Sequence, residues 1–186
     1  MYNKTNKNAG AKIKFSKLEN TRDLGGYITT ENKTLKYKKL IRSGELYTAS
    51  NSDIKILQKE YNLKLIIDFR TPFEEYDRPD PIINNCINIL MPVLMLPFSD
   101  DINVFTSLEQ KKDSLKEIIK NTKLLKEDLQ MIFLDLYSKM VIEPISNRSY
   151  TIFFDKLANY PIAEDESILW HCTSGKDRTG IGTALL

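Results

Sequence analysis

Three short apolar runs constrain the fold of this chain of 186 residues more than any other feature. They read KLIIDF at 64–69, CINIL at 86–90 and SILWHC at 167–172, and Leu35–Arg42 has the pattern of a further strand. Compact apolar runs of this length are typical of buried strands. Because segments with helical periodicity lie between them, the sequence predicts an α/β fold with a mostly parallel central sheet and helices on both faces.

Helical periodicity, with apolar residues at three- and four-residue steps, marks three segments. They are SNSDIKILQKEY at 50–61, Asp113–Val141, and SNRSYTIFFDKLANYP at 146–161. Ser50 or Ser52 can cap the first, and a further helix is expected to begin near Lys176–Arg178. There is no internal repeat or linker, so residues 20–186 are predicted to form one domain.

Composition excludes several classes of protein. A net charge of +2 is too small to argue for a nucleic-acid partner. No apolar stretch is long enough to cross a bilayer. Residues 1–19 are polar and basic and predict a mobile arm, or a bound surface strand, rather than a secretory signal, so a cytoplasmic protein is expected. The single histidine argues against a His-rich metal site, and the two cysteines permit at most one disulfide.

The turn after the last apolar run has the properties of an anion site. Cys172 ends the strand, Gly175 allows a tight turn, and Arg178 begins the next helix. The first amides of a helix lack internal partners and the helix dipole is positive there, so this turn can hold a tetrahedral dianion. We expect the thiolate form of Cys172 to be favoured in that field. Arg178 can place two N–H donors on two phosphate oxygens.

The remaining residues of the turn complete the phosphate site, and they are Thr173, Ser174, Gly175, Lys176 and Thr179. The hydroxyl of Thr179 can be directed at the sulfur. Gly175-Lys176 has the look of a nucleotide-binding loop, but that motif requires glycine where Trp170 stands and Ser or Thr where Asp177 stands, so it is set aside.

The string HCTSGKDRTG at 171–180 resembles the signature loop of cysteine-dependent protein tyrosine phosphatases. Its Lys-Asp pair is similar to that of the atypical bacterial group, which has mycobacterial and listerial members. NTRDLGGY, LIRSGEL and IIDFRTPFEEYDRPD resemble other blocks of that family, in the same order. The resemblance implies a tyrosine-phosphatase-like fold. Part of Asp100–Val141 is expected to form a helical cover over the site, because the stretch is longer than a crossover needs and the related proteins have such a cover, or else only to pack on the sheet as a crossover. Because related proteins continue past the helix at Arg178, we expect the C-terminal helices to be missing, with Ile181, Ala184 and Leu185 packed on the sheet.

The expected chemistry assigns one role to each catalytic residue. Cys172 attacks phosphorus, and Arg178 with the amides of 173–178 binds the oxygens. A proton donor to the leaving group is also needed. Asp177 is the first candidate, or else a helix-start carboxylate stabilised by the dipole. Asp68 is the second candidate, or else the partner of Arg42 or Arg70 in a buried ion pair.

Supporting roles remain for residues around the loop. His171 is expected to hydrogen-bond the loop and tune the thiolate, or simply to be a satisfied strand-end histidine. Lys176 can bind a second phosphate or stay solvated. Cys86 is a strand residue, although a disulfide with Cys172 is conceivable. Five charged residues match family positions and predict an ion-pair network around the loop, and they are Arg22, Asp23, Arg42, Arg70 and Glu74.

These observations predict a phosphatase that needs no metal or cofactor. Its substrates would be phosphotyrosine in proteins, with phosphoserine, phosphothreonine and phosphoinositides as further possibilities. Two alternatives come from other classes: a pseudo-phosphatase that binds phosphate without turnover, and a sulfurtransferase with a loop cysteine. The Arg-Thr-Gly continuation into a helix argues against the sulfurtransferase.

Overall fold

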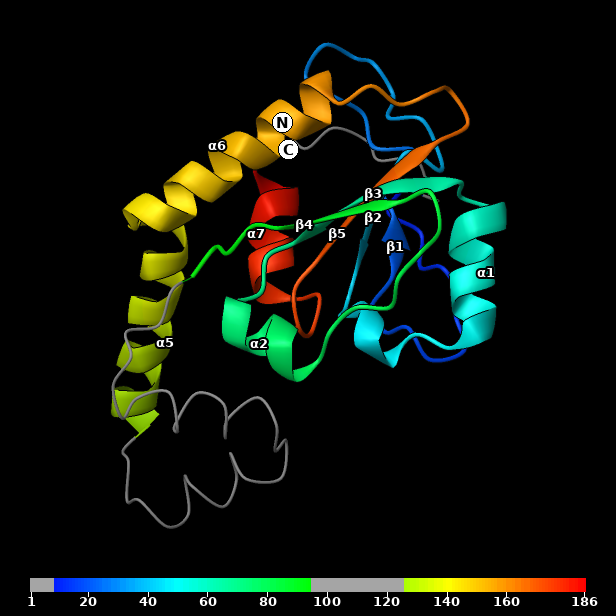
Figure 1. The fold of residues 1–186 in the computed structure, drawn as a ribbon. Helices are drawn as coiled ribbons and strands as arrows, with labels where there is room; N and C mark the ends of the chain where they lie inside the picture. Colours follow the sequence, from blue (N-terminus) through cyan, green and yellow to red (C-terminus); the bar gives the residue numbers. More distant parts are fainter. Residues whose placement is uncertain (1–8, 95–125) are drawn as a thin grey trace.

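The computed structural model describes residues 9–94 and 126–186, which form a sheet covered by helices on both faces (Figure 1). The five strands are ordered β1-β2-β5-β3-β4 across the sheet. Strand β1 is antiparallel to β2, whereas β2, β5, β3 and β4 are mutually parallel. This arrangement confirms the predicted α/β fold. The strands are β1 (Arg22–Asp23), β2 (Leu40–Ser43), β3 (Leu63–Asp68), β4 (Ile87–Leu90) and β5 (Ser167–His171).

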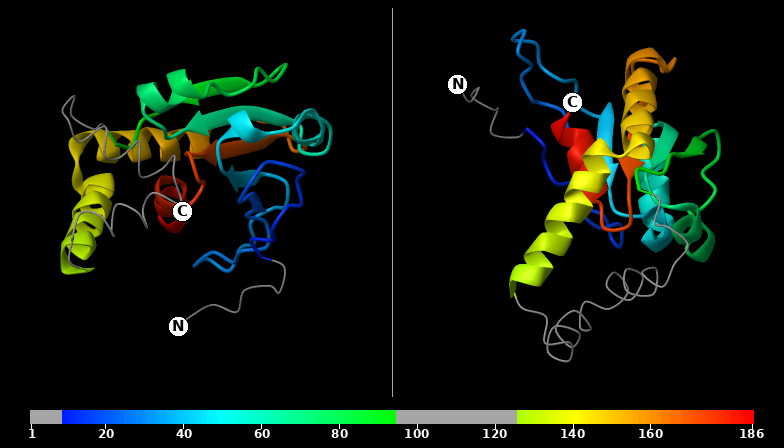
Figure 2. Two further views of the ribbon diagram at one scale, coloured as in Figure 1. Left: turned by 90° about the horizontal axis from the view of Figure 1, so that it is seen from below. Right: turned by 90° about the vertical axis from the view of Figure 1, so that its left-hand side faces the viewer.

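The helices divide between the two faces of the sheet (Figures 1 and 2). One face packs against α1, where Leu57 is fully buried, and the other packs against α6 and α7, where Phe153 is fully buried. Both faces of β5 are therefore covered, which explains why all five of its residues are buried. The helices are α1 (Asn51–Lys59), α2 (Pro72–Asp77), α5 (Lys126–Ile142), α6 (Pro144–Asn159) and α7 (Asp177–Ala184), with a short 3-10 turn, η1, at Leu46–Thr48.

The parallel register brings the ends of three strands to one edge of the sheet. His171 of β5 lies between Ser43 of β2 and Asp68 of β3. Ligands of open α/β sheets bind outside the carboxyl ends of the strands. This edge is therefore where a site is expected, and the turn from β5 to α7 lies on it.

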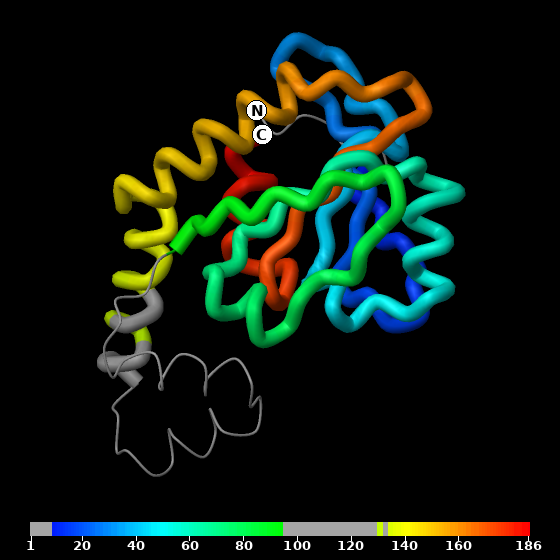
Figure 3. Tube along the Cα trace, in the orientation of Figure 1, coloured from blue at the N-terminus to red at the C-terminus, as the bar shows by residue number. Residues whose placement is uncertain are grey.

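The elements differ from the sequence predictions at several boundaries. The strand predicted over Leu35–Arg42 begins only at Leu40, because Lys38 adopts a left-handed φ of 60° and the chain turns there. Of the two predicted caps, Ser50 and Ser52, it is Ser50 that caps α1, in a capping box with Asp53. The second part of the predicted helix Asp113–Val141 corresponds to α5. Its first part, residues 113–125, lies outside the described residues (Figure 3).

The apolar residues of α7 were predicted to pack on the sheet, and this is correct for one of them. Ile181 packs against the core, whereas Ala184 and Leu185 are exposed. The helix α7 is also anchored by a polar contact, because Trp170 Nε1 donates to Thr183 Oγ1 over 3.3 Å. That bond and the side chain of Ile181 fix which face of the helix is turned to the sheet.

Residues 9–19 lie against the domain rather than apart from it. Lys12 forms an antiparallel bridge with Arg22, and Leu18 is buried. The carboxylate of Asp53 accepts hydrogen bonds from the backbone N–H groups of three consecutive residues, Ser16, Lys17 and Leu18. Burial raises the pKa of Asp53, but the hydrogen bonds from Ser16, Ser50 and Lys17 lower it more, to about 2. Within the described residues, no helix is both long and apolar enough to span a bilayer.

Candidate active site

Cys172 lies at the base of the turn between β5 and α7, at the carboxyl end of a central strand. Its side chain belongs to the buried core beneath the turn, and the residue is 2% exposed. The turn is tight because Gly175 has a φ of +63°, which favours glycine. A Cβ at Gly175 would lie 2.2 Å from the carbonyl oxygen of Ser43. No other residue fits there, so the glycine fixes the path of the turn over β2.

Two side chains from the N-terminal part of the domain bind the outer side of the turn. Asn20 Nδ2 donates to the carbonyl oxygens of Ser174 (3.2 Å) and Gly175 (2.9 Å). Arg42 Nη2 donates to the carbonyl oxygens of Gly175 (2.7 Å) and Lys176 (3.4 Å). Burial lowers the pKa of Arg42, and the charge of Cys172 opposes that shift. The carbonyls of the turn are therefore all drawn toward one side.

The orientation of these carbonyls determines where the amides point. Thr173 follows the same pattern, because its carbonyl oxygen accepts from the N–H of Glu45 over 3.0 Å. In a planar trans peptide the C=O and the following N–H point in opposite directions, and the described residues contain no cis peptide. The N–H groups of residues 174–177 therefore point away from Asn20, Arg42 and Glu45. Four consecutive amides facing one way make a site for an anion.

Arg178 is held in place by α2. Its Nη1 donates to Glu74 Oε2 and its Nη2 donates to Glu74 Oε1, each over 2.7 Å. Nη2 also donates to Thr173 Oγ1 over 3.2 Å. Thr173 Oγ1 in turn donates to Glu74 over 2.5 Å. Burial raises the pKa of Glu74, but the hydrogen bonds and charge of Arg178 lower it more, so the carboxylate stays ionised. Such a bidentate pair fixes the plane of the guanidinium as well as its position.

The helix that carries Arg178 is fixed from the other side by α6. Tyr150 is buried and its hydroxyl donates to the carbonyl oxygen of Arg178 over 2.9 Å. Burial, and then the charge of Cys172, raise the pKa of Tyr150, so the hydroxyl remains a donor. Its ring packs edge-to-face on Phe69, the residue that follows β3. The first turn of α7 is thus joined to two neighbouring elements.

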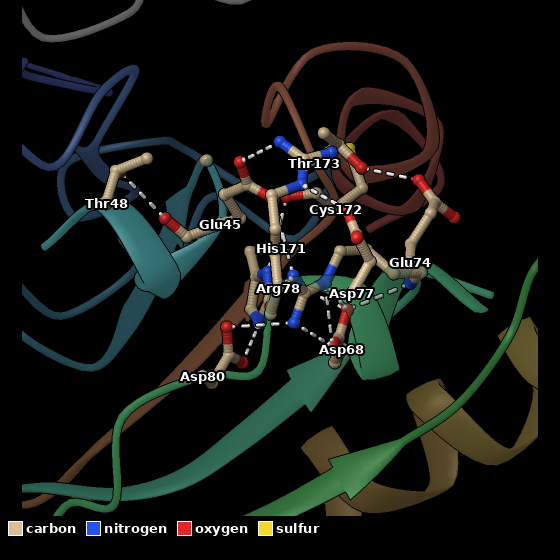
Figure 4. A network of polar contacts seen from close by, with 12 residues as sticks. Glu45, Thr48, Asp68, Glu74, Asp77, Arg78, Asp80, His171, Cys172 and Thr173 are labelled. Carbon is tan, nitrogen blue, oxygen red and sulfur yellow. Dashed lines mark hydrogen bonds and ion pairs between the residues drawn. The ribbon is translucent and has the colours of Figure 1, made fainter. Parts of the chain in front are cut away.

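A buried ion cluster lies behind the turn, around His171 (Figure 4). His171 Nε2 lies 2.8 Å from Asp80 Oδ2, and Nδ1 lies 3.3 Å from the carbonyl oxygen of Cys172 and 3.7 Å from Asp68 Oδ1. Burial lowers the pKa of His171, but the two carboxylates raise it more. The ring therefore contacts the backbone of the turn and faces two carboxylates, and its effect on the thiolate stays a prediction.

The centre of this cluster is Arg70, which is fully buried. Its Nε and Nη2 donate to Asp68, Nη1 donates to Glu45 and to the carbonyl oxygen of Arg78, and Nη2 also donates to Asp80. Asp68, Asp80 and His171 offer three ligand atoms within 4.8 Å of one another. The guanidinium of Arg70 already binds both carboxylates, so the cation of this cluster is the arginine.

Asp177 is the first residue of α7, and its carboxylate accepts a hydrogen bond from the hydroxyl of Tyr137 on α5. The N-cap residue Lys176 makes no side-chain capping bond. Asp68, the second candidate acid, is instead bound by Arg70, which is one of the two ion-pair partners expected for it. The structure therefore places the two candidate acids in different settings: Asp68 in the buried cluster and Asp177 at the turn itself.

Other predicted residues lie as follows. Ser174 and Lys176 are exposed on the turn. Thr179 is buried, and among the described residues its hydroxyl has no hydrogen-bond partner, so its bond to the sulfur remains a prediction. Cys86 and Cys172 are both free, so the conceivable disulfide is absent.

The ion-pair network predicted for five charged residues is correct for two of them, because among the described residues only Arg70 and Glu74 of the five form ion pairs. Arg70 and Glu74 belong to separate clusters, whereas Arg22 donates to the carbonyl oxygen of Gly10 and Asp23 accepts from two backbone amides. Sequence reasoning missed the roles of Asn20, Tyr137 and Tyr150. It also missed α2, although Thr71-Pro72 with Glu74 forms a capping box with proline at the first position, which is a visible signal for a helix start.

A buried cysteine under an amide-lined turn, with an arginine fixed six residues later, defines the class of cysteine-based phosphate sites. The sequence comparison agrees: the model of the tyrosine phosphatase family matches residues 13–186, and the chain belongs to that family. A protein of Cupriavidus necator named "Putative tyrosine-protein phosphatase" is 27% identical over 174 residues. The alignment covers 94% of this chain and 56% of that protein, so the chain spans little more than half of the length of this relative.

Proposed function

We propose that this chain carries the catalytic site of a protein tyrosine phosphatase that works through a cysteinyl-phosphate intermediate. The observation that carries the proposal is the turn from Cys172 to Arg178. Its carbonyls are bound from outside, its amides face the opposite way, and Arg178 is held by Glu74. A phosphate dianion placed over Cys172 would meet these amides and the guanidinium, which bind the oxygens that carry charge in the transition state.

The proposed reaction has two steps that balance. In the first, the Cys172 thiolate attacks phosphorus, the S–P bond forms and the ester P–O bond breaks. The leaving oxygen takes the proton of the Asp177 carboxyl group. In the second, water attacks phosphorus, the Asp177 carboxylate takes a proton from that water, and the S–P bond breaks. Inorganic phosphate leaves, and the thiolate and the protonated Asp177 are regenerated.

Asp177 is the proposed acid rather than Asp68 because of their contacts. The carboxylate of Asp68 is fully buried and accepts from the backbone N–H and the guanidinium of Arg70. Both oxygens of Asp68 are therefore occupied by Arg70 inside the domain, and neither is free to reach a leaving group. Asp177 is partly exposed on the same turn as the nucleophile. In Asp177→Asn we expect phosphotyrosine hydrolysis to fall more than hydrolysis of aryl phosphates with better leaving groups.

The test is turnover of p-nitrophenyl phosphate by the wild type, Cys172→Ser and Cys86→Ser. Cys172→Ser should lose all but a few per cent of the rate, because a hydroxyl is a far weaker nucleophile, while vanadate still binds. Cys86→Ser is the matched control: burial raises the pKa of Cys86 to about 12, so this thiol is neutral at the assay pH and we expect full activity. Rapid quenching should trap one phosphoryl group on the wild type and none on Cys172→Ser.

Two results would contradict the proposal. Turnover that survives in Cys172→Ser would exclude the cysteinyl-phosphate step. A wild type that binds vanadate but does not turn over would establish the phosphate-binding pseudo-phosphatase instead. The exposed side chain of Lys176 on the turn supports a wider substrate range. A substrate panel with phosphoserine peptides, phosphothreonine peptides and soluble phosphoinositides, assayed with Lys176→Ala, tests that range.

A further inference from the structure

A tyrosine on α5 contacts the proposed acid. The hydroxyl of Tyr137 donates to Asp177 Oδ1, across 40 positions of sequence. Tyr137 is 40% exposed, so it lies at the surface of the domain and is not required to fill the core. The hydrogen bond to Asp177, and then burial, raise the pKa of Tyr137 to about 12. The phenol therefore keeps its proton, and remains a donor, throughout the working range of a phosphatase.

The hydrogen bond from Tyr137 restricts the side-chain conformation of Asp177. Asp177 stands at the start of α7, where a short carboxylate commonly turns back onto the free amides of its own helix. Among the described residues, the carboxylate of Asp177 accepts instead from the hydroxyl of Tyr137. The donor on α5 therefore holds the carboxyl group away from a capping position.

We propose that Tyr137 is a positioning residue that orients Asp177 for proton transfer; this inference rests on the proposed role of Asp177 as general acid. In a carboxylic acid the carbonyl oxygen is the better hydrogen-bond acceptor, whereas the hydroxyl oxygen carries the proton. The hydrogen bond from Tyr137 to Oδ1 therefore favours the form of Asp177 that carries its proton on Oδ2. In this way the phenol fixes which oxygen delivers the proton to the leaving group, and α5 supports the catalytic turn.

The experiment is a leaving-group series measured with Tyr137→Phe, which removes the hydroxyl and keeps the ring. For aryl phosphates with poor leaving groups, such as phosphotyrosine, we expect kcat/KM to fall about 3- to 10-fold, the size of one hydrogen bond. For p-nitrophenyl phosphate we expect a change of less than about 2-fold, because a good leaving group depends little on the proton. Tyr76→Phe, the same change at an exposed tyrosine of α2, should leave the whole series unchanged.

The double variant Tyr137→Phe/Asp177→Asn separates positioning from a structural role. If Tyr137 acts through Asp177, the hydroxyl should matter no further once the acid is gone, and the double variant should match Asp177→Asn. An equal loss for every substrate, or a further loss in the double variant, would overturn the inference. If Asp177→Asn itself shows no leaving-group dependence, the acid is elsewhere and the inference falls with it, although the cysteinyl-phosphate mechanism still stands.

A second readout needs no turnover at all. The ionisation of Tyr137 can be followed by ultraviolet absorbance, as the part of the titration signal that is missing from Tyr137→Phe. In Asp177→Ala this ionisation should move to lower pH, because the hydrogen bond and the negative charge are both removed. An unchanged titration would show that the two side chains do not interact in solution and would overturn the inference. This result is independent of whether the chain is an active phosphatase.

Discussion

Two buried arginines, Arg70 and Arg178, are bound in contrasting ways. Arg70 donates to three carboxylates, and its side chain is fully buried. Arg178 is bound by Glu74 and Thr173, and its side chain reaches the surface of the turn with 7% exposure. Both are held tightly, so rigidity does not distinguish a structural arginine from a functional one. The two arginines differ in the number of carboxylates that they bind. The negative charge of the three carboxylates around Arg70 exceeds its single positive charge, so an anion is not attracted there.

The charge count of the Arg70 cluster makes this explicit. The buried carboxylates are those of Glu45, Asp68 and Asp80, and the guanidinium partners are Arg70 and Arg78, which leaves one negative charge. A protonated His171 would balance it, consistent with the raised pKa of that imidazole. The cluster therefore explains how an imidazolium could be kept directly behind Cys172. Its contribution to the site would be indirect, through His171 and the backbone.

The largest effect is expected from Arg70→Leu. Removing the guanidinium leaves buried carboxylates without their partner, and breaking a buried ion pair in this way costs about 3–5 kcal/mol. We expect the free energy of unfolding in urea to fall by that amount. Arg148→Leu, at an exposed position of α6, is the control and should change stability by less than about 0.5 kcal/mol.

If Arg70→Leu does not fold, Arg70→Lys tests the same point. Lysine restores the charge but not the fork of donors, so we expect an intermediate loss of stability. A variant without Arg70 that is as stable as the wild type would show that the cluster is not structural, and the comparison between the two arginines would fail.

The next largest effect is expected from Arg178→Lys, and it changes the rate of hydrolysis rather than the stability. Lysine gives a point charge where the site needs two aligned donors. We expect kcat/KM for p-nitrophenyl phosphate to fall about 10²- to 10³-fold, the usual cost of losing a preorganised donor to transition-state charge. The free energy of unfolding should change less than in Arg70→Leu. If instead stability collapses while the rate per folded molecule survives, the two arginines have the same role.

The contrast between the two arginines also shows what the sequence could predict. The apolar runs predicted β3, β4 and β5, and the order of residues from Cys172 to Arg178 predicted the turn, because both depend on neighbours along the chain. Contacts set by topology could not be found this way. Asn20 and Arg42 reach the turn only because β2 pairs with β5 and β1 pairs with β2. Glu74 matched a family position, but nothing local showed that its carboxylate would bind Arg178, which lies 104 positions later in the sequence.

The smallest effect is expected in the pH dependence of stability, which tests the charge count. The folded pKa of His171 is raised, so the protonated imidazole stabilises the fold fully below its unfolded pKa of about 6.5, and this stability is lost as pH rises through the folded pKa. The groups facing the ring are Asp68, Asp80 and Arg70, the last of which opposes the shift. We expect the free energy of unfolding to decrease above about pH 6.5 with a slope of at most about 1.4 kcal/mol per pH unit, the value for one proton.

Because His171 is the only histidine of the chain, this slope can be assigned. A Cys172→Ser background removes the thiol of the turn from the comparison, and burial raises the pKa of Cys86 to about 12, so Cys86 does not titrate in this window. Asp80→Asn removes a carboxylate 2.8 Å from the ring, so the variant should be less stable near pH 6.5 and show a shallower decrease above it. An equal slope in both proteins would mean that Asp80 does not hold the proton on His171. The surplus negative charge around Arg70 would then have to be balanced by protonation of a carboxylate, for which Glu45 is the candidate, because burial raises its pKa against the opposing charges of Arg78 and Arg70.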